Sequence, residues 1–194
     1  MPNDVPGEHP VAPDDRILPT LAELVGVAFA DLTVLIAALT ARGLTVATAE
    51  SLTGGLLGAV LTEVPGSSAV VRGGLIVYAT DLKHTLAHVD ARLLADRGPV
   101  DPDVAGALAD GARHRCGADI GIGLTGVAGP DPQDAVPVGT WFVAINGPGD
   151  RTARLTSDGD GDGVGLGRAA IRARAVRAAL QLLADTANAD ATVS

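Results

Sequence analysis

The chain has 194 residues, a formal net charge of −9 and an apolar residue content of 47%, values that suit one globular domain with a substantial core. Its 14 Lys and Arg residues form no concentrated basic stripe, and aromatic side chains make up only 2% of the chain. Nucleic-acid binding needs a concentrated basic surface and, for single strands, aromatic stacking platforms. The composition therefore argues against nucleic acid as a partner.

The cysteine content and the hydropathy pattern exclude further classes. Cys116 is the single cysteine, so an internal disulfide framework and a multi-cysteine metal site are excluded. The N-terminus lacks the basic and apolar regions of a signal peptide, and the chain has no apolar run of about 18 residues, the length that crosses a membrane. We therefore expect a soluble, cytoplasmic protein without a membrane partner.

The N-terminal residues predict a tail. Residues 1–16 contain four prolines and four acidic side chains, with little apolar surface to bury, a composition typical of flexible segments. A helical pattern begins at Asp31, a candidate N-cap, and ends at Gly43. The expected organisation is a flexible tail over 1–30, one domain over 31–187 and a C-terminal tail over 188–194.

Helices and strands alternate across the predicted domain. Short runs rich in β-branched residues predict strands, and amphipathic segments between them predict helices. The segment that begins at Asp101 has an N-cap, a proline in its first turn and a glycine at its end. The predicted strands cover 44–50, 73–80, 119–126, 138–146 and 151–157, and the predicted helices cover 31–43, 51–63, 81–89, 101–117 and 168–187. This alternation predicts an α/β fold, a three-layer α/β/α sandwich around a mixed central sheet in a single domain.

Three loops that follow predicted strands carry hydroxyl groups, glycines or the lone lysine. They cover residues 50–55, 78–83 and 124–130. In an open α/β sheet such loops meet at the carboxyl edge, where ligands bind. Each loop alone also fits turn and capping chemistry, because glycine accepts a left-handed backbone and Ser or Thr caps a following helix. Three such loops together favour a functional site at this edge.

Ser51 has two interpretations, a helix cap and a nucleophile. Backbone N–H groups at a helix start would stabilise its alkoxide, and Gly54 and Gly55 allow a ligand to approach closely. A serine nucleophile also needs a base. Lys83, the only lysine, follows a strand end, and a lysine whose pKa is lowered by burial can be that base. Tyr78, the only tyrosine, is a candidate to orient the pair or relay a proton. The alternatives are a solvated charge for Lys83 and a half-buried strand residue for Tyr78.

Two patterns are similar to metal sites. Residues 158–163, DGDGDG, match the first half of a calcium loop, but position twelve would be Ala169 rather than a glutamate. His84 and His88 are spaced to share a helix face, yet the sequence offers no evident third ligand. We expect a flexible acidic turn at 158–163, and neither a metal nor a cofactor.

Several motifs in a fixed order resemble one known family. TAESLTGG at 48–55 is followed by VYATDLK at 77–83, GIGLTGVAGP at 121–130 and PVGTWFVAI at 137–145. Together they resemble the C-terminal domain of CinA, the competence/damage-inducible family that includes the PncC-type nicotinamide-nucleotide amidohydrolases. The resemblance covers about residues 31–185.

This resemblance implies metal-independent deamidation of nicotinamide mononucleotide to nicotinate mononucleotide and ammonia. It implies Ser51 as the nucleophile and Lys83, with Tyr78, as the group that takes and returns the proton. N–H groups of the Thr-Gly-Gly turn would hold the oxyanion, and glycine N–H groups with an arginine would hold the phosphate. A small nucleotide substrate and a homo-oligomer are the implied partners. The implied substrate-binding residues are Glu50, Thr53, Gly54, Gly55, Thr125, Gly126 and Arg168.

The chain departs from the family pattern in two places. Family members often read AGP-GGT-x-x-KPVGT, whereas residues 128–140 read AGPDPQDAVPVGT, which removes a glycine pair and a threonine and adds Asp131 and Asp134. Before the last helix, Leu-Gly replaces a Gly-Asp pair, while Arg168 and Arg172 match. Two alternatives therefore stay open, a nucleotide-binding module without turnover and a hydrolase for a different small amide or ester.

Overall fold

A mixed five-stranded sheet forms the centre of the computed structural model, which describes residues 19–147, 152–157 and 166–188. The strands are β1 (Val46–Glu50), β2 (Val71–Ile76), β3 (Ile120–Gly126), β4 (Trp141–Asn146) and β5 (Thr152–Thr156). They lie in the order β2–β1–β3–β4–β5. β1 is parallel to β2 and β3, whereas β4 is antiparallel to both β3 and β5. The carboxyl ends of β1, β2 and β3 therefore meet at one edge of the sheet.

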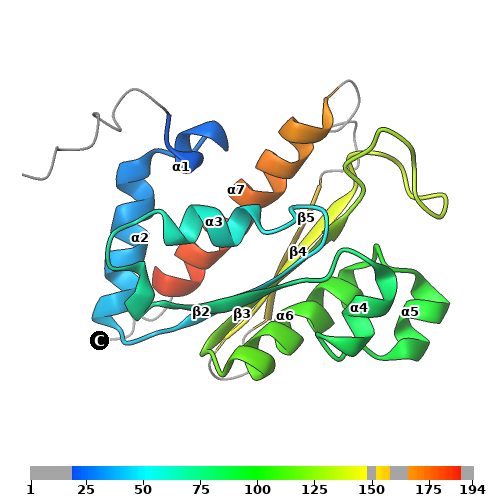
Figure 1. Cartoon of the computed structure of the whole chain (residues 1–194), viewed down its shortest axis with the longest axis horizontal. Helices are drawn as coiled ribbons and strands as arrows, with labels where there is room; N and C mark the ends of the chain where they lie inside the picture. Colours follow the sequence, from blue (N-terminus) through cyan, green and yellow to red (C-terminus); the bar gives the residue numbers. More distant parts are fainter. Residues whose placement is uncertain (1–18, 148–151, 158–165, 189–194) are drawn as a thin grey trace, which may run out of the picture.

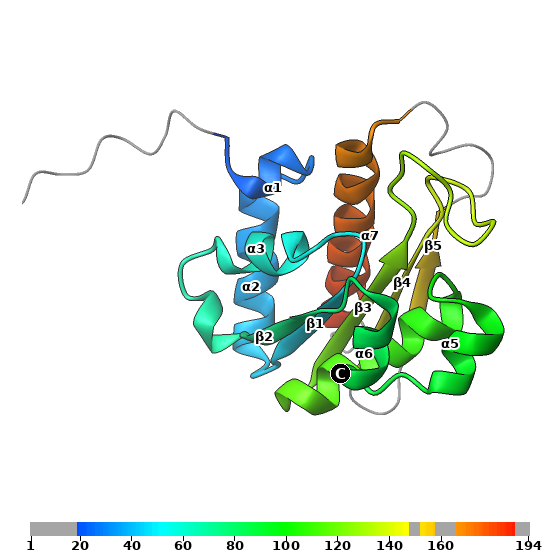
Figure 2. The ribbon, with the colours of Figure 1, turned by 45° about the vertical axis from the view of Figure 1, so that its right-hand side comes forward.

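Helices cover both faces of the sheet, as Figures 1 and 2 show. One layer contains α1 (Leu21–Leu24), α2 (Phe29–Ala41), α3 (Leu56–Thr62) and α7 (Arg168–Asn188). The opposite layer contains α4 (Thr80–Thr85), α5 (Ala91–Arg97) and α6 (Pro102–Cys116). This arrangement confirms the predicted three-layer α/β/α sandwich around a mixed sheet. None of the helices in the described ranges combines the length and the apolar character that a membrane crossing requires.

The two faces of β3 differ, and the difference sets how closely α6 packs. Ile120 and Ile122 are buried in the apolar cluster that includes α2, α3 and α7. Gly121 and Gly123 face α6, where a Cβ atom on Gly121 would lie 1.9 Å from the Ala109 carbonyl oxygen and one on Gly123 would lie 2.2 Å from another α6 carbonyl oxygen. Because no side chain fits there, α6 lies directly on the sheet.

Residues 19–30 belong to the folded domain, although the sequence assigns them to a flexible tail. Thr20 and Glu23 form a reciprocal capping box at the start of α1. The N–H groups of Leu21 and Ala22 donate to the Glu63 carboxylate over 2.7 and 3.1 Å. The sequence pattern missed this helix because its partner lies about forty residues further along the chain. Of the predicted tails, residues 1–18 and 189–194 lie outside the described ranges.

Most other predicted helices and strands are present with shifted ends. α6 keeps its predicted Asp101 cap. α2 starts at Phe29, so Asp31 lies in its first turn rather than at the N-cap. α4 ends at Thr85, and the unpredicted helix α5 follows with Asp90 as its cap. α5 buries no residue, so it offers little apolar periodicity for a sequence pattern to reveal.

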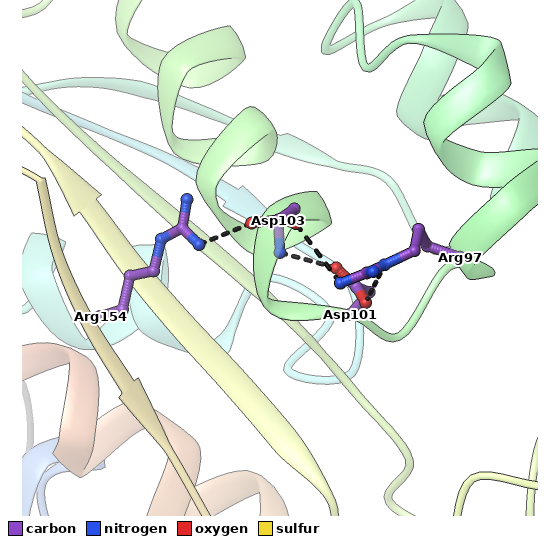
Figure 3. Close-up of polar contacts among 4 residues, drawn as sticks. All are labelled: Arg97, Asp101, Asp103 and Arg154. Atoms are coloured by element: carbon purple, nitrogen blue, oxygen red, sulfur yellow. Dashed lines mark hydrogen bonds and ion pairs between the residues drawn. The ribbon is translucent and has the colours of Figure 1, made fainter.

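A network of charged side chains joins α5, the start of α6 and the edge strand β5 (Figure 3). Arg154 Nη1 donates to Asp103 Oδ1 over 2.7 Å, and Arg97 Nε donates to Asp101 Oδ2 over 3.0 Å. The Asp103 N–H donates to Asp101 Oδ1 and joins the two pairs. Arg97, Asp103 and Arg154 are about half exposed, so each pair adds little stability, and the network mainly fixes how β5 lies against α6.

The Glu50 carboxylate caps the start of α3. Glu50 is only 1% exposed, and its oxygens accept a hydroxyl hydrogen bond from Thr48 over 3.2 Å. They also accept the backbone N–H groups of Gly55, Leu57 and Gly58 over 3.0, 3.0 and 2.8 Å. These are the N–H groups that a helix start leaves without an intrahelical acceptor. Glu50, predicted to bind substrate, is therefore occupied by the fold itself.

The glycine pair lets the chain turn back after Ser51. Gly54 and Gly55 have φ values of +61° and +93°, a left-handed backbone that glycine adopts without steric cost. The turn delays α3, which begins at Leu56 rather than at the predicted 51–54. Ser51 thus precedes a capped turn, not the first residue of a helix.

The replacement Glu50→Ala is expected to lower the free energy of unfolding by about 2 to 4 kcal/mol, because three buried or half-buried N–H groups lose their acceptor. Urea denaturation measures the change. Asp96→Ala, which removes an exposed carboxylate from α5, is the control and is expected to change stability by less than about 0.5 kcal/mol. Equal stability of the two variants would contradict the capping role of Glu50.

Candidate active site

The carboxyl ends of β1, β2 and β3 surround a cavity of about 170 Å³. Ser51 follows β1, Tyr78 lies two residues beyond the end of β2, and Gly126 ends β3. Arg168, at the start of α7, also lines the cavity. The structure thus brings together four residues that the sequence proposed from four separate segments. The remaining lining residues are Leu52, Val127, Ala128, Gly129, Asp131 and Gln133.

A larger cavity of about 570 Å³ lies between α2 and α7. Its lining includes Trp141, Arg174 and Arg177, but no Ser, Thr, Cys or Lys among the described residues. The smaller cavity is lined by Ser51, the nucleophile that the sequence proposes, and is therefore the candidate active site.

Lys83 is hydrogen-bonded directly to Ser51. Its Nζ lies 3.0 Å from Ser51 Oγ and also donates to the carbonyl oxygens of Val77 and Tyr78 over 2.9 and 3.4 Å. Ser51 is 7% exposed and Lys83 is 2% exposed. The alternative in which Lys83 is a solvated charge therefore does not hold. α4 starts immediately after the β2 loop, and this short connection directs the lysine inward to the serine.

Burial lowers the pKa of Lys83 from 10.5 to about 8. The main cause is desolvation, because the charged ammonium loses its water shell in the interior. The Asp81 carboxylate acts in the opposite direction and raises the pKa by Coulomb attraction. Within the described ranges no carboxylate forms an ion pair with Lys83. The amine is consequently neutral far more often than an exposed lysine, as a general base requires.

Tyr78 presents its backbone to Lys83 and its phenol to Arg168. The Tyr78 hydroxyl accepts a hydrogen bond from Arg168 Nη2 over 2.7 Å, and Arg168 Nη1 donates to the Gly129 carbonyl oxygen over 2.7 Å. The tyrosine is 56% exposed and follows β2, which ends at Ile76. The geometry therefore places the phenol in the cavity wall rather than between Ser51 and Lys83, where the sequence suggested a relay.

The N–H groups of the glycine pair are already hydrogen-bonded. The Gly54 N–H donates to the Ser51 carbonyl oxygen over 3.0 Å, and the Gly55 N–H donates to Glu50. Neither is therefore available to an oxyanion, whereas the resemblance implied that N–H groups of the Thr-Gly-Gly turn would hold it. In the part of the chain that the structure describes, the N–H groups of Leu52 and Thr53 have no hydrogen-bond acceptor, and Leu52 lines the cavity.

The two predicted threonines are buried and do not line the cavity. Thr125 is fully buried, and its hydroxyl donates to the Pro99 carbonyl oxygen over 2.6 Å. Thr53 is also fully buried, and its hydroxyl has no hydrogen-bond partner among the described residues. Its carbonyl oxygen accepts a hydrogen bond from Arg172 Nη2 over 2.6 Å. Arg172, which the sequence marked only as a motif match, thus ties the turn after Ser51 to α7.

The cavity also contains groups that sequence reasoning did not assign. Asp131 and Gln133 line it from the loop in which this chain departs from the family pattern. The departure from the family pattern is the sequence feature that could have identified Asp131 as a cavity residue. No sequence pattern marks Leu52, because the relevant group is a backbone N–H that every residue except proline supplies.

The metal-like patterns form no site in the described ranges. α4 ends at Thr85, and His88 has a left-handed backbone with φ of +58°, so His84 and His88 do not share a helix face. His84 Nδ1 lies 2.8 Å from the Val89 carbonyl oxygen. No group of three or more His, Cys, Asp or Glu side chains there is placed to hold a metal ion. The acidic segment 158–163 lies outside the described residues.

Comparisons with known proteins agree with this architecture. The family model described as the CinA C-terminal domain matches residues 31–187. A CinA-like protein from Frankia casuarinae is 45% identical over 153 residues, which cover 77% of this chain and 33% of that protein. The chain spans about a third or less of the length of the first curated relatives that it matches.

Solved structures share the fold over almost their whole length. The competence/damage inducible protein CihA from Agrobacterium tumefaciens is 36% identical, with a TM-score of 0.74 over 82% of this chain and 95% of that chain. A CinA superfamily protein from Enterobacter cloacae is 25% identical, with a TM-score of 0.74 over 96% of this chain and 99% of that chain. Since the family model also covers residues 31–187, the chain belongs to the CinA C-terminal domain family.

Proposed function

We propose that this chain is a serine amidohydrolase that converts nicotinamide mononucleotide to nicotinate mononucleotide and ammonia. The observation that carries the proposal is the 3.0 Å contact between Ser51 Oγ and the Nζ of a buried lysine, Lys83. The resemblance of the motifs to nicotinamide-nucleotide amidohydrolases supports the choice of substrate.

Lys83 is held in an orientation that suits a base. A neutral amine has two N–H bonds and one lone pair. The carbonyl oxygens of Val77 and Tyr78 can accept the two N–H bonds, which leaves the lone pair directed at Ser51 Oγ. Two backbone acceptors thus select the direction from which Lys83 takes a proton.

In the first half-reaction, neutral Lys83 accepts the Ser51 hydroxyl proton while Oγ attacks the carboxamide carbon. A C–O bond forms, and the carbonyl electron pair moves to its oxygen to give a tetrahedral oxyanion. Lys83 then donates the proton to the amide nitrogen, the C–N bond breaks, and ammonia leaves. The product is an ester between Ser51 and the nicotinoyl group.

In the second half-reaction, water replaces ammonia. Neutral Lys83 takes a proton from the water, whose oxygen attacks the ester carbonyl carbon. The proton returns to Ser51 Oγ as the ester C–O bond breaks. Nicotinate mononucleotide leaves, and the Ser51 hydroxyl and the neutral amine are restored.

The oxyanion needs donors at the carbonyl oxygen of the substrate. The Leu52 N–H is the candidate, because it follows the nucleophile directly, lines the cavity and has no acceptor within the described residues. The phosphate is assigned to Arg168, the one cation among the described residues that line the cavity. Its guanidinium has five N–H donors, and two of its nitrogens use one each on Tyr78 and Gly129.

A different small amide is the second candidate substrate. The observation in its favour is that Asp131 and Gln133 occupy a cavity wall where the family pattern has small residues. The serine and lysine chemistry would be unchanged in that case.

Ser51→Ala is expected to lower kcat for ammonia release from nicotinamide mononucleotide by at least about a thousandfold, because the nucleophile is lost. Lys83→Met is expected to have a loss of similar size, since the two groups act as one unit. An enzyme-coupled ammonia assay measures both. Ser67→Ala removes a serine of equal burial that is not among the residues that line the cavity, and it is expected to keep wild-type turnover. Wild-type protein without turnover would refute the proposed substrate, and an active Ser51→Ala would refute the mechanism.

The rate should depend on the protonation state of Lys83. Only the neutral amine accepts a proton, so with a pKa of about 8 kcat/KM is expected to rise with pH up to about 8 and then level off. Asp81→Asn removes the charge that raises this pKa, so it is expected to move the rising limb to lower pH. Asp96→Asn, a change of equal charge on α5, is expected to leave the limb in place. A pH profile that is flat between about 6 and 9, or a limb that Asp81→Asn moves upward, would contradict Lys83 as the base.

A further inference from the structure

Asp131 is a carboxylate in the wall of the catalytic cavity that the mechanism does not use. It lines the same cavity as Ser51. It is exposed, and in the described part of the chain it forms no hydrogen bond or ion pair. Its charge is therefore not neutralised by a neighbouring protein side chain, and it interacts electrostatically with a ligand in the cavity.

The cavity is small, about 170 Å³, so a ring bound in it lies near the residues of its wall. We take about 5 to 7 Å as the order of magnitude of the separation between such a ring and a charge in the wall. The carboxamide carbon must reach Ser51 Oγ, and an aromatic ring bonded to that carbon then occupies the cavity itself. The phosphate, separated from the ring by a ribose, lies further out.

The other charge in the wall, Arg168, is held in place by two hydrogen bonds to neutral groups. Arg168 donates to the Tyr78 hydroxyl and to the Gly129 carbonyl oxygen, which hold its guanidinium at the cavity wall. Among the described lining residues, Asp131 and Arg168 are the two charged side chains. A cationic ring is thus attracted by Asp131, while an anionic group suits Arg168.

We propose that Asp131 makes the cavity selective for a carboxamide carried by a positively charged aromatic ring, such as a pyridinium. This inference rests on the proposed function. It explains why the cavity would bind the oxidised form of the substrate rather than the reduced form. The pyridinium ring of nicotinamide mononucleotide is cationic, whereas the dihydropyridine ring of its reduced form is neutral. The two molecules have the same carboxamide, ribose and phosphate, so they differ mainly in the charge that Asp131 would recognise.

The experiment measures binding of both molecules by isothermal titration calorimetry. Ser51→Ala protein is used so that neither is hydrolysed, and Asp131→Asn is added to it. At about 5 to 7 Å and an effective dielectric constant of about 40 to 80, the lost attraction corresponds to about a threefold to fifteenfold weaker affinity for the pyridinium form. The affinity for the reduced form is expected to change by less than about twofold, and the selective effect is expected to shrink as salt is added.

Asp134→Asn is the matched control. Asp134 is an exposed carboxylate of the same loop that does not line the cavity. Its backbone is left-handed, with φ of +48°, a conformation that asparagine also accepts. This variant makes the same change in net charge and is expected to leave both affinities unchanged.

The other roles of Asp131 give different results. If the carboxylate binds the ribose hydroxyls, Asp131→Asn lowers the affinity for both molecules equally. If the carboxylate repels the phosphate, Asp131→Asn raises the affinity for both molecules. Either result, or equal affinities before and after the change, overturns the inference while turnover by wild-type protein still supports the proposed function. Absence of both binding and turnover overturns the proposed function as well.

Discussion

The burial of Lys83 beside Ser51 is the interaction on which the rest of the site depends. A lysine that is 2% exposed and has no ion-pair partner within the described ranges stays charged only at a cost, and its pKa falls to about 8 as a result. Three oxygen atoms surround Nζ, and only one of them, Ser51 Oγ, can give up a proton. In the proposed mechanism, burial and local geometry are therefore what make Lys83 a base for one particular hydroxyl group.

The scaffold achieves this with two neighbouring residues at the end of β1 that have different tasks. Glu50 faces the α3 layer, where its carboxylate accepts three backbone N–H groups. Ser51 faces the cavity and Lys83. The turn between β1 and α3 is thus fixed by the fold, and Arg172 ties it to α7 from the other side. A rigid turn of this kind would keep Ser51, the proposed nucleophile, in place before substrate binds.

The sequence predicted the parts of this site that depend on residue type and strand order. Ser51 and Lys83 follow neighbouring strands, and the carboxyl ends of those strands had to meet in the predicted sheet. Other features depend on distant contacts that no local pattern contains. The Tyr78 phenol pairs with Arg168, 90 residues away, and the residues of α1 are fixed by Glu63. The role of Glu50 was missed because a carboxylate next to a nucleophile suggests chemistry, whereas here its backbone partners lie five to eight residues further along the chain.

The most direct test of the central claim uses the fact that Lys83 is the only lysine in the chain. Protein labelled with ¹³C at the lysine Cε gives one side-chain signal, whose chemical shift reports the protonation state of Nζ as pH is varied. The burial of Lys83, partly offset by the Asp81 carboxylate, predicts a titration midpoint of about 8. A midpoint at the ordinary lysine value of about 10.4 would show a solvated ammonium and would contradict Lys83 as the base for Ser51.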